Sequence, residues 1–440
     1  MFREEYKRKL MSPLQAVSYV KSGDWIEFGF FANLPLVLDE ALAERMEELR
    51  DIKLRGGVLM APLKTLEHPE ATFHSFHFGG MERKLSQENK AFHIPIKYAE
   101  VPRYIRENLL TDVVMVQTTP MDQYGYFNFG VTFSHFKASA SKARTVIVEI
   151  NENLPRVHGG YDAALHISEV DCIVEGGKNG VFQLPSSEPN EIDKKIAELV
   201  LAELSDGACL QLGIGGMPNA LGKMIAKSDL KDLGIQSEML ADSFVDIVQA
   251  GKVTGSKKQI DVGRIVFTFA AGSQRLYDFM HDNPMLAAYP VDYVNDPMII
   301  AKNDNVVSIN GALELDITGQ VCSESVGYRQ FSGTGGQVDF VEGAYRSKGG
   351  KSFLCLPATY RGKNGELLSR IKPELTEGSV VTTPRTAVQY VVTEFGKANI
   401  KGASTWRRAE QLIGIAHPDL RDHLIAQAEK KNIWRRSNRI

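Results

Sequence analysis

The sequence predicts an α/β fold made of two similar domains in tandem, each a mostly parallel sheet with helices on both faces. Three observations predict this fold: the chain length, an alternation of apolar runs with helical patterns, and a similarity between the two halves. The chain has 440 residues, of which 43% are hydrophobic and 24% are charged. One hydrophobic core rarely extends over that length, so two domains of roughly 200 residues each are expected.

The spacing of apolar residues predicts where strands and helices lie. Short apolar runs are expected to form strands at 112–117, 145–150, 208–214 and 264–270. Amphipathic spacing predicts helices over 34–50 and 189–204. Strands that alternate with helices are typical of parallel sheets.

A linker-like segment separates the predicted domains. LPSSEPNE (184–191) is rich in proline, serine and acids and precedes the second helical segment. Such composition is common at domain boundaries. We therefore expect an N-terminal domain over residues 1–186 and a C-terminal domain over residues 187–440.

The similarity between the halves suggests a tandem duplication. GDWIEFGFFANLPLVLDEAL (23–42) reads like DGACLQLGIGGMPNALGKMI (206–225), with a strand, a glycine and a turn into a helix. A further alignment matches Asp51 with Asp232 and places Gly57 opposite Glu238. Only the second half then carries an acid at this position, so the sheet itself does not need one there.

Composition narrows the class of protein. The net charge is −3, so the chain as a whole is not expected to bind nucleic acid. The start MFREEYKRKL is not followed by a signal-peptide core, and no apolar run approaches the ~20 residues of a membrane span. We expect a cytoplasmic protein without a membrane segment. Buried, reduced thiols are expected at Cys172, Cys209, Cys322 and Cys355.

Two glycine-rich segments flag a possible site. In GIGGMPNALGKM (213–224), Gly213, Gly215 and Gly216 follow a strand and lead into a helix, whose free N–H groups favour an anion or a developing oxyanion. In FSGTGGQVDF (331–340), Gly333, Gly335 and Gly336 could form a backbone nest for an anion or a carbonyl oxygen. The first segment is also compatible with a tight turn, or with a dinucleotide-binding loop that lacks its third glycine. The second is compatible with a bulged turn.

Glu238, in GIQSEMLADSF (234–244), could be a surface charge, a ribose-binding acid or a nucleophile. A carboxylate can attack a thioester carbonyl to form a mixed anhydride, and glycine-rich backbone can supply N–H donors for the tetrahedral intermediate. The thiolate that leaves can return and convert the glutamate to a thioester. This chemistry needs neither a metal nor a redox cofactor.

Two other kinds of site receive less support. His74 and His77, in HSFHFGG, are spaced like a metal pair, but no third ligand is evident, and a role in the core or a loop is favoured. No G-x-S-x-G elbow is present, so a serine nucleophile is unsupported.

The chain resembles family I coenzyme A-transferases of the acetyl-CoA hydrolase/transferase group, and most of all 4-hydroxybutyrate CoA-transferases. The resemblance covers nearly the whole chain. It is carried in the first half by DVVMVQTTPMDQYGYFNFG (112–130) and VIVEINENLPRVHG (146–159), and in the second half by GIGGMPNAL, GIQSEML, VDYVNDP (291–297), GQVCSES (319–325), SGTGGQVDF, SRIKP (369–373), VVTEFG (391–396) and LIGIAHPDLR (412–421).

The resemblance implies roles for individual residues. Glu238 matches the catalytic glutamate, which attacks the acyl-CoA and then carries CoA as a thioester. The glycines at 333, 335 and 336 match a loop that helps form the oxyanion hole and the CoA site, and those at 215 and 216 line the same pocket. Asn295 and Glu394 match positions near the active site. Glu324, in CSESVG, is a competing nucleophile, but the order of glycine loop, helix, strand and acid favours Glu238 and leaves Glu324 as a neighbouring acid.

The resemblance further implies CoA transfer between a short-chain acyl-CoA, such as acetyl-CoA or butyryl-CoA, and a carboxylate, such as 4-hydroxybutyrate or acetate. It also implies a homodimer, with no metal and no permanently bound cofactor. Acyl-CoA hydrolysis by the same glutamate and a non-catalytic metabolite-binding module remain alternatives. Aromatic residues of the first half are expected to line a small acyl pocket, for example Phe30, Phe31, Tyr124 and Phe127.

Overall fold

The computed structural model describes residues 2–176 and 180–433, and within it the chain divides into two compact units that are discontinuous in sequence. The first comprises Met1–Pro185, Glu238–Leu240 and Ile265–Asn295, and the second comprises Ser186–Ser237, Ala241–Arg264 and Asp296–Ile440. Glu238 is therefore grouped with the first unit by its contacts, although it lies in the second half of the sequence. The sequence boundary between residues 186 and 187 stays a prediction.

The first unit is built on a seven-stranded sheet whose neighbouring strands are all parallel. The strands lie in the order β4 (Ala91–His93), β3 (Ala71–Ser75), β2 (Ile52–Gly56), β1 (Trp25–Phe28), β5 (Val113–Thr118), β7 (Thr145–Ile150) and β9 (Cys172–Glu175). Every residue of β5 and β7 is buried, as expected for parallel strands that are covered on both faces.

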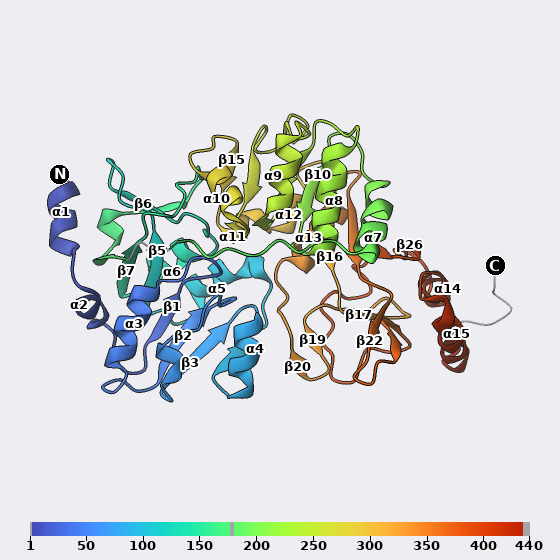
Figure 1. Ribbon diagram of the computed structural model, residues 1–440, viewed down its shortest axis with the longest axis horizontal. Coiled ribbons are helices and arrows are strands. Elements are labelled where there is room, and N and C mark those ends of the chain that lie inside the picture. The colour runs from blue at the N-terminus through green and yellow to red at the C-terminus, as the bar shows by residue number, and fades with distance from the viewer. Residues whose placement is uncertain (1, 177–179, 434–440) are drawn as a thin grey trace. The chain divides into compact units, whose positions relative to one another are not determined.

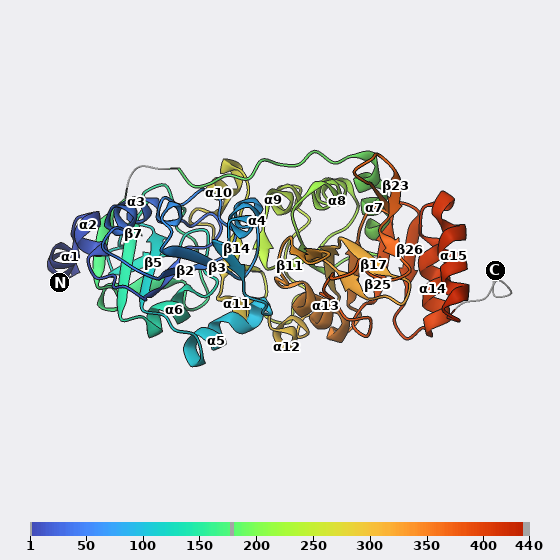
Figure 2. The same ribbon diagram turned by 90° about the horizontal axis from the view of Figure 1, so that it is seen from below.

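Short strand pairs and helices complete the first unit. The pairs are β6 (Tyr126–Asn128) with β8 (Ala164–His166), β12 (Met239–Leu240) with β14 (Phe269–Ala270), and β13 (Ile265–Phe267) with β15 (Leu286–Ala288). The helices are α1 (Phe2–Lys9), α2 (Pro13–Val17), α3 (Leu36–Arg45), η1 (Thr65–Glu67), α4 (Gly80–Gln87), η2 (Tyr98–Glu100), α5 (Val101–Glu107), α6 (Phe136–Lys142), η3 (Ile167–Glu169), α10 (Gln274–Met280) and α11 (Val291–Val294). In Figure 2, α3 and α4 lie on one face of the sheet and α5 and α6 on the other.

The second unit repeats this arrangement. Its main strands are neighbours in the order β11 (Gly234–Gln236), β10 (Cys209–Leu212), β16 (Val306–Gly311), β21 (Lys351–Cys355), β25 (Tyr390–Thr393) and β26 (Gly396–Asn399). These pairs are parallel except the hairpin of β25 and β26. Smaller sheets are formed by β18 (Val321–Cys322), β17 (Glu314–Asp316) and β24 (Ile371–Lys372), by β19 (Ser325–Val326) and β20 (Arg329–Gln330), and by β22 (Thr359–Arg361) and β23 (Leu367–Ser369).

Helices also cover both faces of the second unit's main sheet. They are α7 (Glu191–Leu201), α8 (Gly216–Lys227), α9 (Asp242–Gln249), α12 (Pro297–Ile300), α13 (Gln337–Arg346), α14 (Thr405–Gly414), η4 (Pro418–Leu420) and α15 (Arg421–Lys430). Figure 2 shows α7, α8 and α9 on one face, with α12 and α13 on the other. The predicted α/β class with two similar units is confirmed.

The duplication is evident from the strand order of each unit, of which the strands β1, β2, β5 and β7 are labelled in Figure 1. The run β2-β1-β5-β7 in the first unit corresponds to β11-β10-β16-β21 in the second. Asp51 and Asp232, which the sequence alignment matches, both adopt a left-handed backbone, with φ of 56° and 58°. Both precede the corresponding strand, so the alignment that sets Gly57 opposite Glu238 agrees with the structure.

The four cysteines are free and buried, as predicted. Burial raises the pKa of the Cys209 thiol to about 11 and that of Cys355 to about 12. Thiols with such values are almost entirely protonated near neutral pH and are poor nucleophiles. These cysteines therefore serve as small apolar residues of the two cores.

Glu149, near the end of β7, predicts a specific pH dependence of stability. Burial raises the pKa of its carboxyl to about 7, although the Gln117 amide and the Leu38 N–H donate to its oxygens at 2.8 and 3.0 Å. An unfolded glutamate titrates near its ordinary value, so between about pH 5 and pH 8 the folded protein holds a proton that the unfolded chain has lost. Stability must therefore fall as the pH rises through this window, by on the order of 2 kcal/mol.

Urea unfolding of wild type and Glu149→Gln at several pH values between 5 and 8 measures this effect. The uncharged glutamine removes the titration, so the wild type should lose stability relative to the variant as the pH rises. The free energy of unfolding is plotted against pH for both proteins, and the difference between the two slopes gives the contribution of Glu149. A change in stability that is the same at every pH does not affect this difference. Parallel pH profiles would show that Glu149 does not titrate in this range.

Candidate active site

Glu238 lies between β11 and β12 and is only half-buried. Its backbone carbonyl accepts hydrogen bonds from the N–H groups of Thr268 and Phe269, at 3.0 and 3.3 Å. Thr268 interrupts the apolar run that the sequence predicts as one strand over 264–270, and the run forms the two strands β13 and β14 instead. The break turns two N–H groups toward Glu238 and fixes the backbone of this residue.

Asn295 holds the side chain of Glu238. Its amide nitrogen donates to Oε2 of Glu238 at 2.7 Å, and the asparagine is fully buried at the end of α11. The following Asp296 caps α12 through the Met298 N–H, so Asn295 sits at a junction of two short helices. The structure therefore brings together two of the residues that the sequence singles out. Within residues 2–176 and 180–433, Oδ1 of Asn295 has no hydrogen-bond partner.

Tyr98, which the sequence analysis missed, lies beside Glu238 in the first unit. Burial raises the pKa of its phenol well above the ordinary value, and the negative charge of Glu238 raises it further. Its hydroxyl lies 2.5 Å from the Ser134 hydroxyl. Tyr98 belongs to no motif, and its short 3₁₀ turn gives no periodic signal, so the sequence offers nothing that would identify it.

Aromatic side chains surround Tyr98. Phe30 stacks on the Tyr98 ring with 5.5 Å between centroids, and Phe269 packs against Phe30 and Phe31 at 5.5 and 5.2 Å. Phe30 and Phe31 thus belong to an aromatic cluster next to the backbone of Glu238. Two other aromatic residues proposed for an acyl pocket do not join this cluster, since Tyr124 is largely exposed and Phe127 stacks on Tyr6.

The glycine loop at 213–216 opens helix α8 in the second unit. Gly215 has φ of 120°, a conformation that L side chains rarely adopt, so glycine is required there. A Cβ at Gly216 would lie 2.3 Å from Oδ2 of Asp193, so glycine lets α7 approach this helix closely. The Asp193 carboxylate therefore lies near the N-terminus of α8.

The second glycine loop, Gly333 to Gly336, precedes α13 and is held by Glu324. Gly335 is left-handed, with φ of 52°. The backbone carbonyl of Glu324 accepts the N–H groups of Phe331 and Ser332 at 2.8 and 3.0 Å, and its carboxylate accepts the hydroxyls of Thr334 and Thr382 at 3.3 and 3.0 Å. Glu324 is thus buried among donors and braces the glycine loop.

Replacement of Glu324 measures this bracing. Glu324→Ala should lower the free energy of unfolding by about 2 kcal/mol, because it leaves buried hydroxyls without an acceptor. Glu324→Gln, which retains one acceptor oxygen, should lose about half as much. Glu198→Ala, at an exposed position on α7, provides the surface control in urea unfolding. Equal stability of Glu324→Ala and wild type would contradict the bracing role.

Glu394 also lies in the second unit, at the turn between β25 and β26. Its Oε2 accepts the Ala358 N–H at 2.8 Å and so supports the segment that follows β21. The two candidate acids other than Glu238 therefore each make a structural hydrogen bond to nearby backbone or hydroxyl groups.

The two histidines proposed as a possible metal pair are embedded among other side chains. The His74 ring packs against Trp25 and Phe92, at 4.6 and 5.4 Å between centroids. Burial lowers the pKa of His77 to about 4. In the part of the chain that the structure describes, no group of three His, Cys, Asp or Glu side chains is arranged to hold a metal ion.

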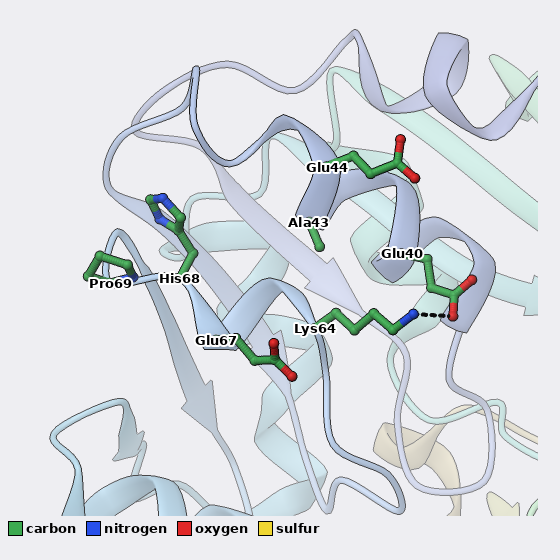
Figure 3. A pocket seen from close by; sticks show the side chains of 7 residues that line it. All are labelled: Glu40, Ala43, Glu44, Lys64, Glu67, His68 and Pro69. Atoms are coloured by element: carbon green, nitrogen blue, oxygen red, sulfur yellow. Dashed lines mark hydrogen bonds and ion pairs between the residues drawn. The ribbon is translucent and has the colours of Figure 1, made fainter.

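A hollow of about 530 Å³ on the first unit lies between α3 and η1 (Figure 3). Charged side chains dominate its lining, and the Lys64 ammonium points to Glu40, with 2.7 Å between Nζ and Oε1. None of the predicted site residues lines it. Among the described helices, none is both long enough and apolar enough to cross a bilayer.

Comparisons with known proteins match the whole chain. The Acetyl-CoA hydrolase/transferase N-terminal domain matches residues 1–185, and the C-terminal domain of the same name matches residues 272–428. Butyryl-CoA:acetate CoA-transferase from Anaerostipes caccae is 51% identical, with 100% of both chains covered. The 4-hydroxybutyrate coenzyme A transferase from Clostridium kluyveri is 40% identical over 98% of this chain and 99% of its own. The crystal structure of RipA from Yersinia pestis has a TM-score of 0.90 at 38% identity and covers 98% of this chain and 99% of its own.

Proposed function

The chain belongs to the acetyl-CoA hydrolase/transferase family, and from this premise we propose that it transfers coenzyme A from a short-chain acyl-CoA to a carboxylate, with Glu238 as the nucleophile. The observation that carries the proposal is the geometry of Glu238. Its backbone is held by two N–H groups and its Oε2 is held by Asn295 at 2.7 Å. A half-buried carboxylate oriented in this way is suited to attack a carbonyl carbon.

The proposed reaction has two symmetric halves. The Glu238 oxygen attacks the thioester carbonyl, the C–S bond breaks, and the CoA thiolate leaves behind an acyl-glutamyl anhydride. The thiolate then attacks the glutamyl carbonyl, which expels the first carboxylate and leaves a glutamyl-CoA thioester. The acceptor carboxylate attacks this thioester, and the same two steps in reverse yield the new acyl-CoA and free Glu238. Glu238 supplies the nucleophile and N–H groups are proposed to stabilise the oxyanion, so the proposal requires neither a metal nor a resident cofactor.

We assign supporting roles to the other predicted residues. Asn295 orients the Glu238 carboxylate. Backbone N–H groups of Gly215, Gly216 and the loop Gly333–Gly336 are proposed to bind CoA and the developing oxyanion. Glu324 and Glu394 act through the backbone segments that they hold. A cytoplasmic homodimer is part of the same proposal, and sedimentation of the purified protein tests the oligomeric state.

The first substrates to test are butyryl-CoA and acetate. The relative whose name contains this pair is 51% identical, compared with 40% for the 4-hydroxybutyrate enzyme. Acetyl-CoA as donor and 4-hydroxybutyrate as acceptor form the second pair. The ratio of kcat/KM between the acceptors decides which acid the chain prefers.

Covalent trapping tests the proposed nucleophile. The protein is incubated with butyryl-CoA, reduced with borohydride and digested, and its peptides are analysed by mass spectrometry. Reduction of a glutamyl thioester to the alcohol removes roughly 14 Da from one residue, which should be Glu238. Reduction at Glu324 would transfer the role to that residue. CoA release without an acceptor acid, at the rate seen with one, would instead favour acyl-CoA hydrolysis by water.

A further inference from the structure

A continuous chain of buried polar side chains runs through the first unit and ends beside Glu238. Its members are drawn from several separate segments and are at most 9% exposed. They are, in order, Thr111, Arg55, Glu27, His135, Ser134 and Tyr98. The core of the sheet does not need such a chain, because burial of charges costs free energy that apolar side chains would not.

The charged end of the chain is an ion pair between adjacent strands. Arg55 on β2 is paired in register with Glu27 on β1 and donates to Oε1 of Glu27 through Nε. Nη2 of Arg55 donates to the Thr111 hydroxyl oxygen at 2.8 Å. Burial alone would raise the pKa of Glu27, but Arg55 and His135 outweigh burial and lower it, so Glu27 is ionised.

The other end of the chain consists of His135, Ser134 and Tyr98. The ionised Glu27 can only accept, so Nε2 of His135, 3.0 Å from Oε2 of Glu27, carries the hydrogen. With that hydrogen on Nε2, a ring that carries no second proton leaves Nδ1 as an acceptor for the Ser134 hydroxyl, 2.8 Å away. A Ser134 hydroxyl that donates to His135 can only accept from Tyr98, whose hydroxyl oxygen lies 2.5 Å away.

Ser134 also connects this chain to two groups that hold Glu238, namely Thr268 and the helix that ends at Asn295. Its N–H donates to Oγ1 of Thr268 at 3.1 Å, and the Thr268 N–H donates to the Glu238 carbonyl. The Ser134 carbonyl accepts the Val291 N–H at 2.9 Å, at the start of the helix that ends in Asn295. Ser134 is fully buried with φ of 42°, an unfavourable backbone for a serine. A strained backbone of this kind is retained only where the surrounding contacts enforce it, and such positions are often found at functional sites.

We propose that the hydrogen bonds among Glu27, His135 and Ser134, here called the relay, direct the Tyr98 O–H to the Ser134 oxygen. Tyr98 then does not donate a hydrogen bond to the Glu238 carboxylate. This inference rests on the proposed role of Glu238 as nucleophile. A tyrosine hydroxyl that donated to the carboxylate would form a strong, charge-assisted hydrogen bond and would lower the nucleophilicity of Glu238. Ser134 is accordingly a positioning residue, because it acts on the reaction through Glu238.

A double-mutant cycle tests the relay. The rate constant for formation of the Glu238 adduct is measured by rapid quench and borohydride trapping in Ser134→Ala, Tyr98→Phe and the double variant. Loss of the Ser134 hydroxyl frees the Tyr98 proton, so Ser134→Ala should slow adduct formation about tenfold, with KM for the acyl-CoA changed less than about twofold. Tyr98→Phe should stay within about threefold of wild type. The double variant should recover to the same level, because no competing proton remains.

Two further variants keep the test interpretable. Ser139→Ala removes another fully buried hydroxyl, one without a hydrogen-bond partner in the described chain, and should match wild type. Ser134→Gly also removes the hydroxyl but relieves the left-handed backbone, so it replaces Ser134→Ala if that variant fails to fold. A double variant as slow as Ser134→Ala, or a Ser134→Ala enzyme at the wild-type rate, would overturn the relay. Absence of an adduct at Glu238 in the wild type would overturn the proposed function itself.

Discussion

Glu238→Gln is expected to lower kcat for CoA transfer by about 10⁴-fold or more. Glutamine has nearly the same shape and can still accept the Asn295 N–H, so the local structure should be retained. It lacks the anionic oxygen that attacks the thioester, and removal of a covalent nucleophile typically costs several orders of magnitude in rate. Steady-state transfer from butyryl-CoA to acetate, with thermal melting as a check on folding, measures the effect.

Two comparisons sharpen this prediction. Glu238→Asp keeps the charge but withdraws it by one methylene, so it should retain activity about 10²-fold below wild type. Glu324→Gln and Glu394→Gln should still form the borohydride-sensitive adduct at Glu238. Transfer by Glu238→Gln within tenfold of wild type would exclude Glu238 as the nucleophile.

Arg55→Met is expected to cause the largest loss of stability, about 3–5 kcal/mol. Arg55 and Glu27 are each no more than 2% exposed, and the guanidinium also lies 5.4 Å from the centre of the Trp25 ring. Methionine fills part of the space but leaves the Glu27 carboxylate buried without its cation. Breaking a buried ion pair from one side typically costs this amount.

A second cycle isolates the pair from simple loss of packing. The variant with both Arg55→Met and Glu27→Gln should be more stable than Arg55→Met alone, because no unpaired charge remains. The cost of Arg55→Met should also be greater at pH 8 than at pH 5. Without Arg55, burial raises the pKa of Glu27, so the folded variant takes up a proton at low pH and loses stability as the pH rises. Additive free energies in the cycle, with no pH dependence, would show that the ion pair contributes little.

Periodicity predicted much of the fold because parallel strands buried on both faces are continuous apolar runs. The runs at 112–117 and 145–150 coincide with β5 and β7 to within one residue. The run at 264–270 was predicted as one strand and is two, because Thr268 interrupts the pairing and turns toward Glu238. A single polar residue within an apolar run gives no sign of such a break.

The candidate site was predictable only in part. Glu238 and Asn295 stood out through local motifs, and the structure joins them by a hydrogen bond. The chain of buried polar side chains from Arg55 to Tyr98 could not be found in this way. Its members have no regular spacing and meet only when separate segments pack together. Its residues are also of types that, one by one, are common in any sheet protein.

The composition of the first unit has a consequence for how the chain folds as it is made. This unit includes residues 238–240 and 265–295, so its final segment leaves the ribosome long after residue 185. The N-terminal half therefore cannot complete its packing until residues 265–295 have been synthesised. Long sequence separation between partners slows folding. Truncated products that end near residue 185 would expose unfinished surfaces and be natural substrates for chaperones and proteases.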